Sequence, residues 1–403
     1  SPFRGYPKAW PFGSGFLLEM NTKSSKRILF CILVLAVLSG SASARSLEND
    51  ECAAKLVEKI YFECLNGDYK QAIQDNKELI RLCPQEPLPR FFLATIYMYL
   101  LRSYWDYPKD KRFVLIKSEF ENLIKEGLKV CDNYPNQNAN VYFCKGGILG
   151  TAGLIDLQAK NWLKAYLKGQ KAIAALNKAL ELNPEQYDAY LGLGIFEYYC
   201  ARLTGTVRIL AWIVGFTGDK DKGLEYMKKA MKKGKYSNGP AKVFLAGAYL
   251  AYENEILKSI ALTKELRAKY PGNILYIDYV VRAAKKLPEH QVDLGIEWIN
   301  NLIKIPHWKD LVNLTVPFDL DTIDFELACL FQKKGDYVQA LSLLEALAAN
   351  RKLWNDLTAQ IHLKLLQLYK KSGNLAAAKK ISEQMLDHTS INRSPKKARL
   401  FIK

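Results

Sequence analysis

One pattern of hydrophobic and small residues recurs along the chain. In the segment GDYKQAIQDNKELIRLCP, Ala72 follows Tyr69 by three positions and Pro84 lies twelve positions further on. The apolar residues between them recur with the period of an amphipathic helix, and no strand-like alternation or Asn-Gly hairpin signal competes with this period. The pattern therefore predicts pairs of helices. Four other copies carry Ala172, Ala179 and Pro184; Gly247, Leu250, Ser259 and Pro271; Ala328, Phe331, Gly335, Tyr337 and Ala340; and Tyr369, Gly373, Leu375 and Ala378.

These positions resemble the tetratricopeptide repeat superfamily over nearly all of the chain that follows residue 44. Small residues let two helices approach closely, an aromatic side chain fills the space beside them, and the proline ends the second helix because it has no backbone N–H to donate. One pair cannot bury its apolar face alone, so the copies must stack. We therefore predict an all-α fold, a right-handed superhelical solenoid of about eight antiparallel helix pairs, with insertions in the second to fourth pairs.

The N-terminal region has the features of a secretory signal peptide. Basic residues near Lys23 precede the apolar segment Ile28–Leu38, and Ala42 and Ala44 have the spacing of a cleavage site. The apolar segment is too short to span a bilayer, although a retained anchor is the alternative. We expect an exported bacterial protein, periplasmic or secreted. The predicted segments are 1–19 (translated upstream sequence), 20–44 (signal peptide), 45–304 (main array), 305–321 (break with two prolines), 322–390 (C-terminal pairs) and 391–403 (basic tail).

The chain is basic, with a net charge of +17. Removal of the first 44 residues takes away five basic residues and one acidic residue, which leaves +13. The excess is spread along helices, with only short clusters such as Lys228–Lys235. For an exported protein this charge favours an acidic protein surface, an anionic lipid or an anionic polysaccharide as partner, and no nucleic acid. The alternative is that the lysines form solvated helix faces that keep the protein soluble.

Nothing in the sequence assembles a catalytic, metal or cofactor site. The four histidines have no metal-binding spacing, and the chain has no G-x-S-x-G motif and no phosphate-binding loop. After residue 44 the number of cysteines is odd and none forms a C-x-x-C pair, so zinc and thioredoxin-like sites are not indicated. In an oxidising compartment the candidate disulfides are Cys64 with Cys83 and Cys131 with Cys144, because each could join neighbouring antiparallel helices, and buried free thiols are the alternative. We predict no enzyme activity, no metal and no cofactor.

An apolar stretch, Val207–Phe216, interrupts the fourth helix pair. It contains Arg208 and is too short to span a bilayer. The region around it, with Gly215, Gly218 and Asp219, resembles the inclusion-body clearance proteins of fungi and their animal tetratricopeptide relatives. Because those relatives are linked to lipid droplets or organelle membranes, the resemblance implies an apolar helix that meets lipid or a partner. The alternative is a helix packed into the solenoid's own core.

Two functions follow from these features. The first is a non-enzymatic exported scaffold that binds a protein or peptide in the concave groove of the solenoid, in the bacterial cell envelope. The second is attachment to a lipid or membrane surface through the apolar stretch and its basic neighbours. The sequence leaves the oligomeric state open. The expected groove residues are Leu191, Tyr198, Tyr199, Phe244, Ala248 and Tyr252, and the expected lipid or partner contacts are Arg202, Arg208, Trp212 and Phe216.

Overall fold

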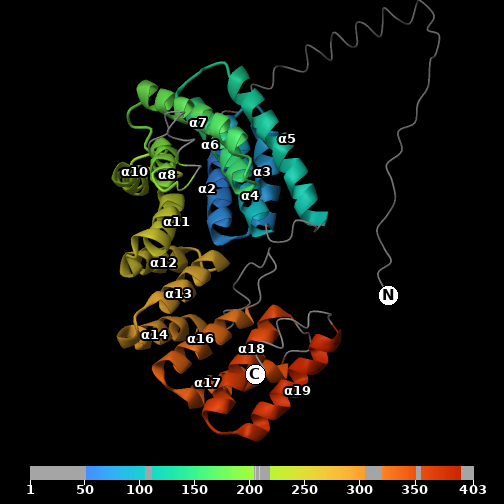
Figure 1. The fold of residues 1–403 in the computed structure, drawn as a ribbon. Coiled ribbons are helices and arrows are strands. Elements are labelled where there is room, and N and C mark those ends of the chain that lie inside the picture. The colour runs from blue at the N-terminus through green and yellow to red at the C-terminus, as the bar shows by residue number, and fades with distance from the viewer. Residues whose placement is uncertain are drawn as a thin grey trace, which may run out of the picture. The chain divides into compact units, whose positions relative to one another are not determined.

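The computed structural model describes residues 51–104, 111–203, 218–304, 320–350 and 355–391, together with Gly205 and Arg208. These residues form helices and no strand (Figure 1). The predicted segments 1–19 and 20–44, almost all of 305–321, and 392–403 lie outside them. The elements are α2 (Glu51–Asn66), α3 (Tyr69–Leu82), α4 (Pro87–Ser103), α5 (Lys111–Asn133), α6 (Ala139–Gln158), α7 (Trp162–Leu182), α8 (Ala189–Cys200), α10 (Lys220–Lys233), α11 (Asn238–Ala248), the π-helix η1 (Tyr249–Glu253), α12 (Ile256–Lys269), α13 (Ile274–Lys286), the 3₁₀ helix η2 (Glu289–Gln291), α14 (Val292–Ile303), α16 (Asp321–Lys334), α17 (Tyr337–Asn350), α18 (Asp356–Lys371) and α19 (Leu375–Ile391).

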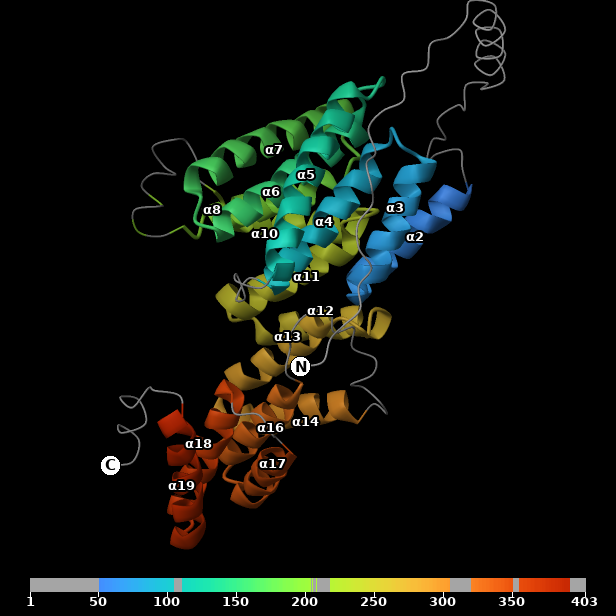
Figure 2. The ribbon, with the colours of Figure 1, turned by 90° about the vertical axis from the view of Figure 1, so that its right-hand side faces the viewer.

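In the described residues, eight pairs of consecutive helices pack against each other, from α2 with α3 to α18 with α19 (Figures 1 and 2). Each pair then contacts the next, as α3 contacts α4 and α12 contacts α13. The predicted all-α solenoid of about eight antiparallel pairs is thereby confirmed. The small residues of the repeat pattern lie where the helices meet, and Ala72, Ala179 and Ala340 have no exposed surface.

Local signals in the sequence set several helix ends. The side chain of Asn138 accepts a hydrogen bond from the backbone N–H of Val141, and Asp219 accepts two from the start of α10, which satisfies amides that have no partner within the helix. At the other end of a helix, Gly335 adopts a left-handed conformation with φ of 89° and closes α16. No helix in the described part of the chain is long and apolar enough to cross a membrane.

Two glycines bring α8 and α10 into close contact. A Cβ atom on Gly223 would lie 2.6 Å from the backbone nitrogen of Tyr198, and one on Gly194 would lie 2.8 Å from the carbonyl oxygen of Gly223. These distances are too short for any other residue without a shift of the backbone. Glycine at both positions therefore lets the two backbones touch, which is the role of small residues in the repeat pattern.

A long-range contact that the repeat pattern does not predict joins α2 to α11 and α13. The backbone carbonyl of Leu65 accepts hydrogen bonds from Asn273 and Tyr276, both at 2.9 Å. The hydroxyl of Tyr61 accepts a hydrogen bond from the backbone N–H of Gly239 at 3.0 Å. Tyr276 is fully buried in this contact. The first helix is thus held by residues more than 170 positions later in the chain.

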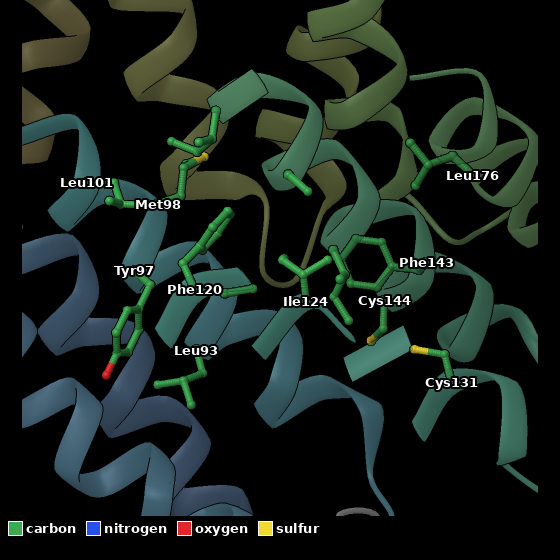
Figure 3. Close-up of a cluster of buried hydrophobic side chains, with 14 of the residues drawn as sticks. Leu93, Tyr97, Met98, Leu101, Phe120, Ile124, Cys131, Phe143, Cys144 and Leu176 are labelled. Atoms are coloured by element: carbon green, nitrogen blue, oxygen red, sulfur yellow. The ribbon is translucent and has the colours of Figure 1, made fainter. Parts of the chain in front are cut away.

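The largest core cluster lies among α4 to α8, and Figure 3 shows part of it. Cys131 and Cys144 are buried in this cluster and lie near each other (Figure 3). Burial raises the pKa of Cys131 to about 12 and that of Cys144 well above its usual value. Cys64, Cys131 and Cys144 are free thiols in the structure. The two pairings remain predictions.

One carboxyl group between α2 and α3 is held in an environment that favours its neutral form. Glu63 is buried, and this burial, together with its hydrogen bond to Asp75, raises its pKa to about 7. Lys59 pairs with Asp75 at 2.6 Å and lies further from Glu63, at 3.6 Å. Although burial opposes it, hydrogen bonding from Lys59, Glu63 and Gln71 lowers the pKa of Asp75. Below about pH 7 the arrangement is therefore a protonated Glu63 beside an ionised Asp75.

Because α8 and α10 are in close contact, adding one methyl group at Gly223 should strongly lower the stability of the fold. We expect Gly223→Ala to lower the free energy of unfolding by about 2–4 kcal/mol, because the new methyl would press on the Tyr198 backbone. Gly150, in α6, is the control, since nothing lies within 4 Å of a Cβ at that position. Gly150→Ala should be neutral or stabilise by up to about 1 kcal/mol. Urea unfolding followed by circular dichroism measures both, and equal losses would contradict the close contact.

The raised pKa of Glu63 predicts a pH dependence of stability. In the unfolded chain Glu63 ionises near its usual value, whereas in the folded chain it stays protonated until about pH 7. Its contribution to stability is therefore complete in acid and is lost as the pH rises through about 7. We expect Glu63→Gln to remove this loss and to stabilise the protein at pH 8 by on the order of 1 kcal/mol relative to wild type. Glu58 is exposed on the same helix and is the control. Glu58→Gln should leave the pH dependence of the free energy of unfolding between pH 5 and 8 as it is in wild type, as measured by urea unfolding.

Candidate functional site

The six expected groove residues lie close together but differ in accessibility. Tyr198 and Ala248 have no exposed surface, so their side chains belong to the core and cannot meet a partner in this conformation. Tyr252 is 52% exposed. The other three, Leu191, Tyr199 and Phe244, are half-buried beside the core cluster of α8, α10 and α11. The accessible part of the predicted groove is therefore centred on Tyr199 and Tyr252.

Three of these tyrosines form one aromatic group. The ring of Tyr199 meets the ring of Tyr198 edge-on at 5.2 Å, and Tyr252 meets Tyr198 at 6.3 Å and Tyr199 at 6.1 Å. Tyr252 comes to α8 because α11 ends in the π-helix η1, whose wider turn changes the direction of its side chains. Asn254, in the left-handed conformation with φ of 56°, stops this turn.

Arg202 contacts two of the three rings of this aromatic group. Its guanidinium lies over the rings of Tyr198 and Tyr252, at 4.5 Å and 4.8 Å from their centroids, and it forms an ion pair with Glu253. The hydroxyl of Tyr198 donates a hydrogen bond to Glu253 at 2.8 Å, and Lys220 reaches the same carboxylate at 3.3 Å. Glu253 is thus the shared acceptor of three groups, which come from α8, from the turn after α8 and from α10. The charge of Arg202 is neutralised within the protein.

Two further elements supply tyrosines and a second arginine. Burial raises the pKa of Tyr199 to about 12 and raises the pKa of Tyr99 in α4 and of Tyr279 in α13. The positive charge of Arg102 opposes this rise at each of the three hydroxyls, so Arg102 lies near all of them. Arg102 is exposed and has no carboxylate partner among the described residues. We call Arg102, Tyr99, Tyr199, Tyr252 and Tyr279 the Arg–Tyr cluster.

The sequence did not single out Arg102, Tyr99 or Tyr279. Arg102 and Tyr99 lie three residues apart, on one side of α4, and this spacing was the available signal. Tyr99 also lines a small cavity of about 50 Å³ between α2, α4 and α11, walled by apolar side chains such as Ile96 and Pro240. This volume is far below that of a metabolite site. The arrangement can therefore bind a surface but does not enclose a small molecule there.

The expected lipid contacts are only partly within the described residues. Trp212 and Phe216 lie outside them, whereas Arg208 is described and exposed. Lys222, near the apolar stretch, pairs with Glu197 at 2.7 Å. No group of three His, Cys, Asp or Glu in the described ranges has the geometry to hold a metal ion.

Comparisons with known proteins give no family for this chain. No family model matches, and no curated protein matches. Among solved structures, an IFIT1 monomeric mutant with Gppp-AAAA is 15% identical with a TM-score of 0.32, over 81% of this chain and 76% of that chain. The human IFIT1 dimer with PPP-AAAA is 15% identical with a TM-score of 0.31, over 81% and 75% of the two chains. At these values the likeness carries no inference about a ligand.

The partly buried ion pair of Arg202 should matter for stability, unlike an exposed one. We expect Arg202→Gln to lower the free energy of unfolding by about 1–3 kcal/mol, because Glu253 would lose its main partner while staying mostly buried. Lys222→Gln breaks the more exposed pair with Glu197 and should cost less than about 1 kcal/mol. Urea unfolding compares the two variants. A similarly small loss of unfolding free energy in both variants would show that the ion pair of Arg202 does not stabilise the site.

Proposed function

We propose that this protein is a non-enzymatic helical-repeat scaffold that binds a protein or peptide partner through the Arg–Tyr cluster. The observation that carries the proposal is that the rings of Tyr199 and Tyr252 lie 6.1 Å apart and that the charge of Arg102 acts on the Tyr199 hydroxyl, although the three residues are about 50 to 150 positions apart in sequence. Tyrosine and arginine are the residue types that most often dominate binding energy at protein interfaces, since each offers a large apolar surface with a polar end.

The chemistry of the cluster favours binding over catalysis. Burial raises the pKa of Tyr199 to about 12 and shifts Tyr99 and Tyr279 in the same direction, so their hydroxyls are protonated at neutral pH. A protonated phenol donates and accepts hydrogen bonds but is a poor nucleophile and base. Arg102 adds a fixed positive charge that can meet a carboxylate of the partner.

The cellular setting of the proposal comes from the sequence. The signal-peptide pattern of residues 20–44 supports export to the bacterial cell envelope. In that setting a polypeptide is a more suitable partner than a nucleic acid. Contact with anionic lipid through Val207–Phe216 is the second candidate. It has less support, because Arg202 and Lys220 share Glu253, which leaves less free charge for headgroups.

Selection of a random-peptide phage library on residues 45–403 tests the proposed function. We expect enriched peptides whose binding, measured by fluorescence anisotropy, weakens at least about 10-fold in Arg102→Gln/Tyr252→Ala. Both side chains are exposed, so the variant should fold. Arg81→Gln/Trp162→Ala, an exposed arginine and an exposed aromatic elsewhere, is the matched control and should bind as wild type. The proposal is wrong if no peptide is enriched or if the control loses as much affinity.

A further inference from the structure

A second group of tyrosines and lysines lies on the opposite side of α8 from Tyr199. Tyr190 and Tyr199 are nine residues apart, which is roughly two and a half helical turns and places them on opposite faces. On the Tyr190 side, α8 and the residues before it meet α10. We define the Lys–Tyr stripe as Tyr187, Tyr190, Tyr226, Lys229 and Lys233.

The stripe has a defined geometry. The rings of Tyr187 and Tyr190 stack with centroids 6.4 Å apart, and the ring of Tyr226 meets Tyr190 edge-on at 5.1 Å. The ammonium group of Lys229 lies 3.8 Å from the centroid of Tyr190. That of Lys233 lies 4.7 Å from the centroid of Tyr187 and donates to its hydroxyl at 3.3 Å. Two flexible side chains are thus held in place by aromatic rings.

The positive charge of this surface is not neutralised. A tyrosine ring attracts an ammonium group but carries no net charge, so the lysines keep theirs. In the part of the chain that the structure describes, Lys229 and Lys233 form no ion pair, and the same holds for three lysines around them. The carboxylate of Asp188, which lies between the two tyrosines in sequence, is buried and accepts hydrogen bonds from Tyr236 and Ser237. The surrounding lysines are Lys228, Lys232 and Lys235.

The position of these lysines at the end of α10 explains only part of the pattern. Lysines in a last helical turn are stabilised by the helix dipole, which accounts for the presence of Lys233 there. The dipole does not account for the placement of Lys229 and Lys233 over two stacked rings. Lys229 and Lys233 lie one turn apart, with their backbone positions roughly 6 Å apart along the helix axis. Such a row is complementary to a chain that carries closely spaced negative groups.

Two kinds of anionic partner fit the surface poorly. A membrane-binding helix exposes large apolar side chains beside its lysines, but in α10 the apolar residues Leu224, Met227 and Met231 are buried or half-buried. Single-stranded nucleic acid stacks its bases on open aromatic faces. In the stripe, one face of Tyr190 is covered by Lys229, and Tyr190 also stacks on Tyr187.

We propose that the Lys–Tyr stripe binds an acidic polypeptide segment, rich in Asp and Glu, of a partner protein. The carboxylates of such a segment would pair with Lys229 and Lys233 and would not require free ring faces or an apolar contact. The stripe shares no residue with the Arg–Tyr cluster. It is therefore a second binding surface, and its function does not depend on that of the first.

The test is fluorescence anisotropy with a labelled oligoglutamate peptide and residues 45–403. We expect binding that weakens with salt and a dissociation constant at least about 10-fold higher in Lys229→Gln/Lys233→Gln. Lys125→Gln/Lys129→Gln is the matched control, because it removes two exposed lysines that also lie one turn apart, on α5. The control should change the constant less than about 2-fold. Arg102→Gln/Tyr252→Ala should also bind oligoglutamate as wild type, which separates this proposal from the first.

A further variant tests the role of the rings. Tyr190→Leu keeps every charge but removes the ring under Lys229, and we expect it to weaken oligoglutamate binding about 3-fold. Equal losses in the Lys229 and Lys125 double variants would overturn the proposal, because net charge alone would then account for binding. Tighter binding of oligouridylate, or of vesicles of phosphatidylcholine and phosphatidylglycerol, through Lys229 and Lys233 would also overturn it. So would the absence of oligoglutamate binding at low salt.

Discussion

The close approach of α8 and α10 is the constraint on which both binding surfaces depend. Gly194 and Gly223 leave no side chain between the two backbones, so α10 lies directly against the Tyr198 backbone. On one side this brings Lys220 within reach of Glu253, which also binds Arg202. On the other side it brings Lys229 and Lys233 of α10 over Tyr190 of α8 and over Tyr187, which precedes α8. A separation larger by one methyl group would affect both sides at once, because the two faces belong to the same pair of helices.

Tyrosine has different roles on these two faces, and the neighbouring carboxylates account for the difference. Arg202 and Lys229 both lie over tyrosine rings. Glu253 neutralises Arg202, so that contact is internal and joins the turn after α8 to η1. Lys229 has no such partner in the described part of the chain, and its charge is available to another molecule. The net charge of the sequence is only a sum over the chain. It does not show which basic side chains pair with carboxylates in the fold and which do not.

Much of the fold follows from local sequence. The spacing of Ala, an aromatic residue and Pro in each copy identifies helix pairs because helix contacts and helix ends are decided within some 34 residues of one another. The contact of α2 with α13 could not be predicted in this way. Its hydrogen bonds use the backbone carbonyl of Leu65, which every residue has, and the partners lie more than 200 residues away. Asn273 also caps α13, so its sequence signal is fully explained by a local role.

The sequence predicted the site only in part, because the direction in which a side chain points depends on its exact position within one helical turn. Tyr198 and Tyr199 are neighbours, and the sequence does not show which of them faces the core, because both are large and amphipathic. The position of Tyr252 depends on the π-helix η1, and a regular α-helix through the same residues would place its ring in another direction. Arg102 has the sequence environment of an ordinary exposed helical residue. It becomes part of a site only because α8 and α13, from distant repeats, bring Tyr199 and Tyr279 to it, and this convergence is a property of the stacked array.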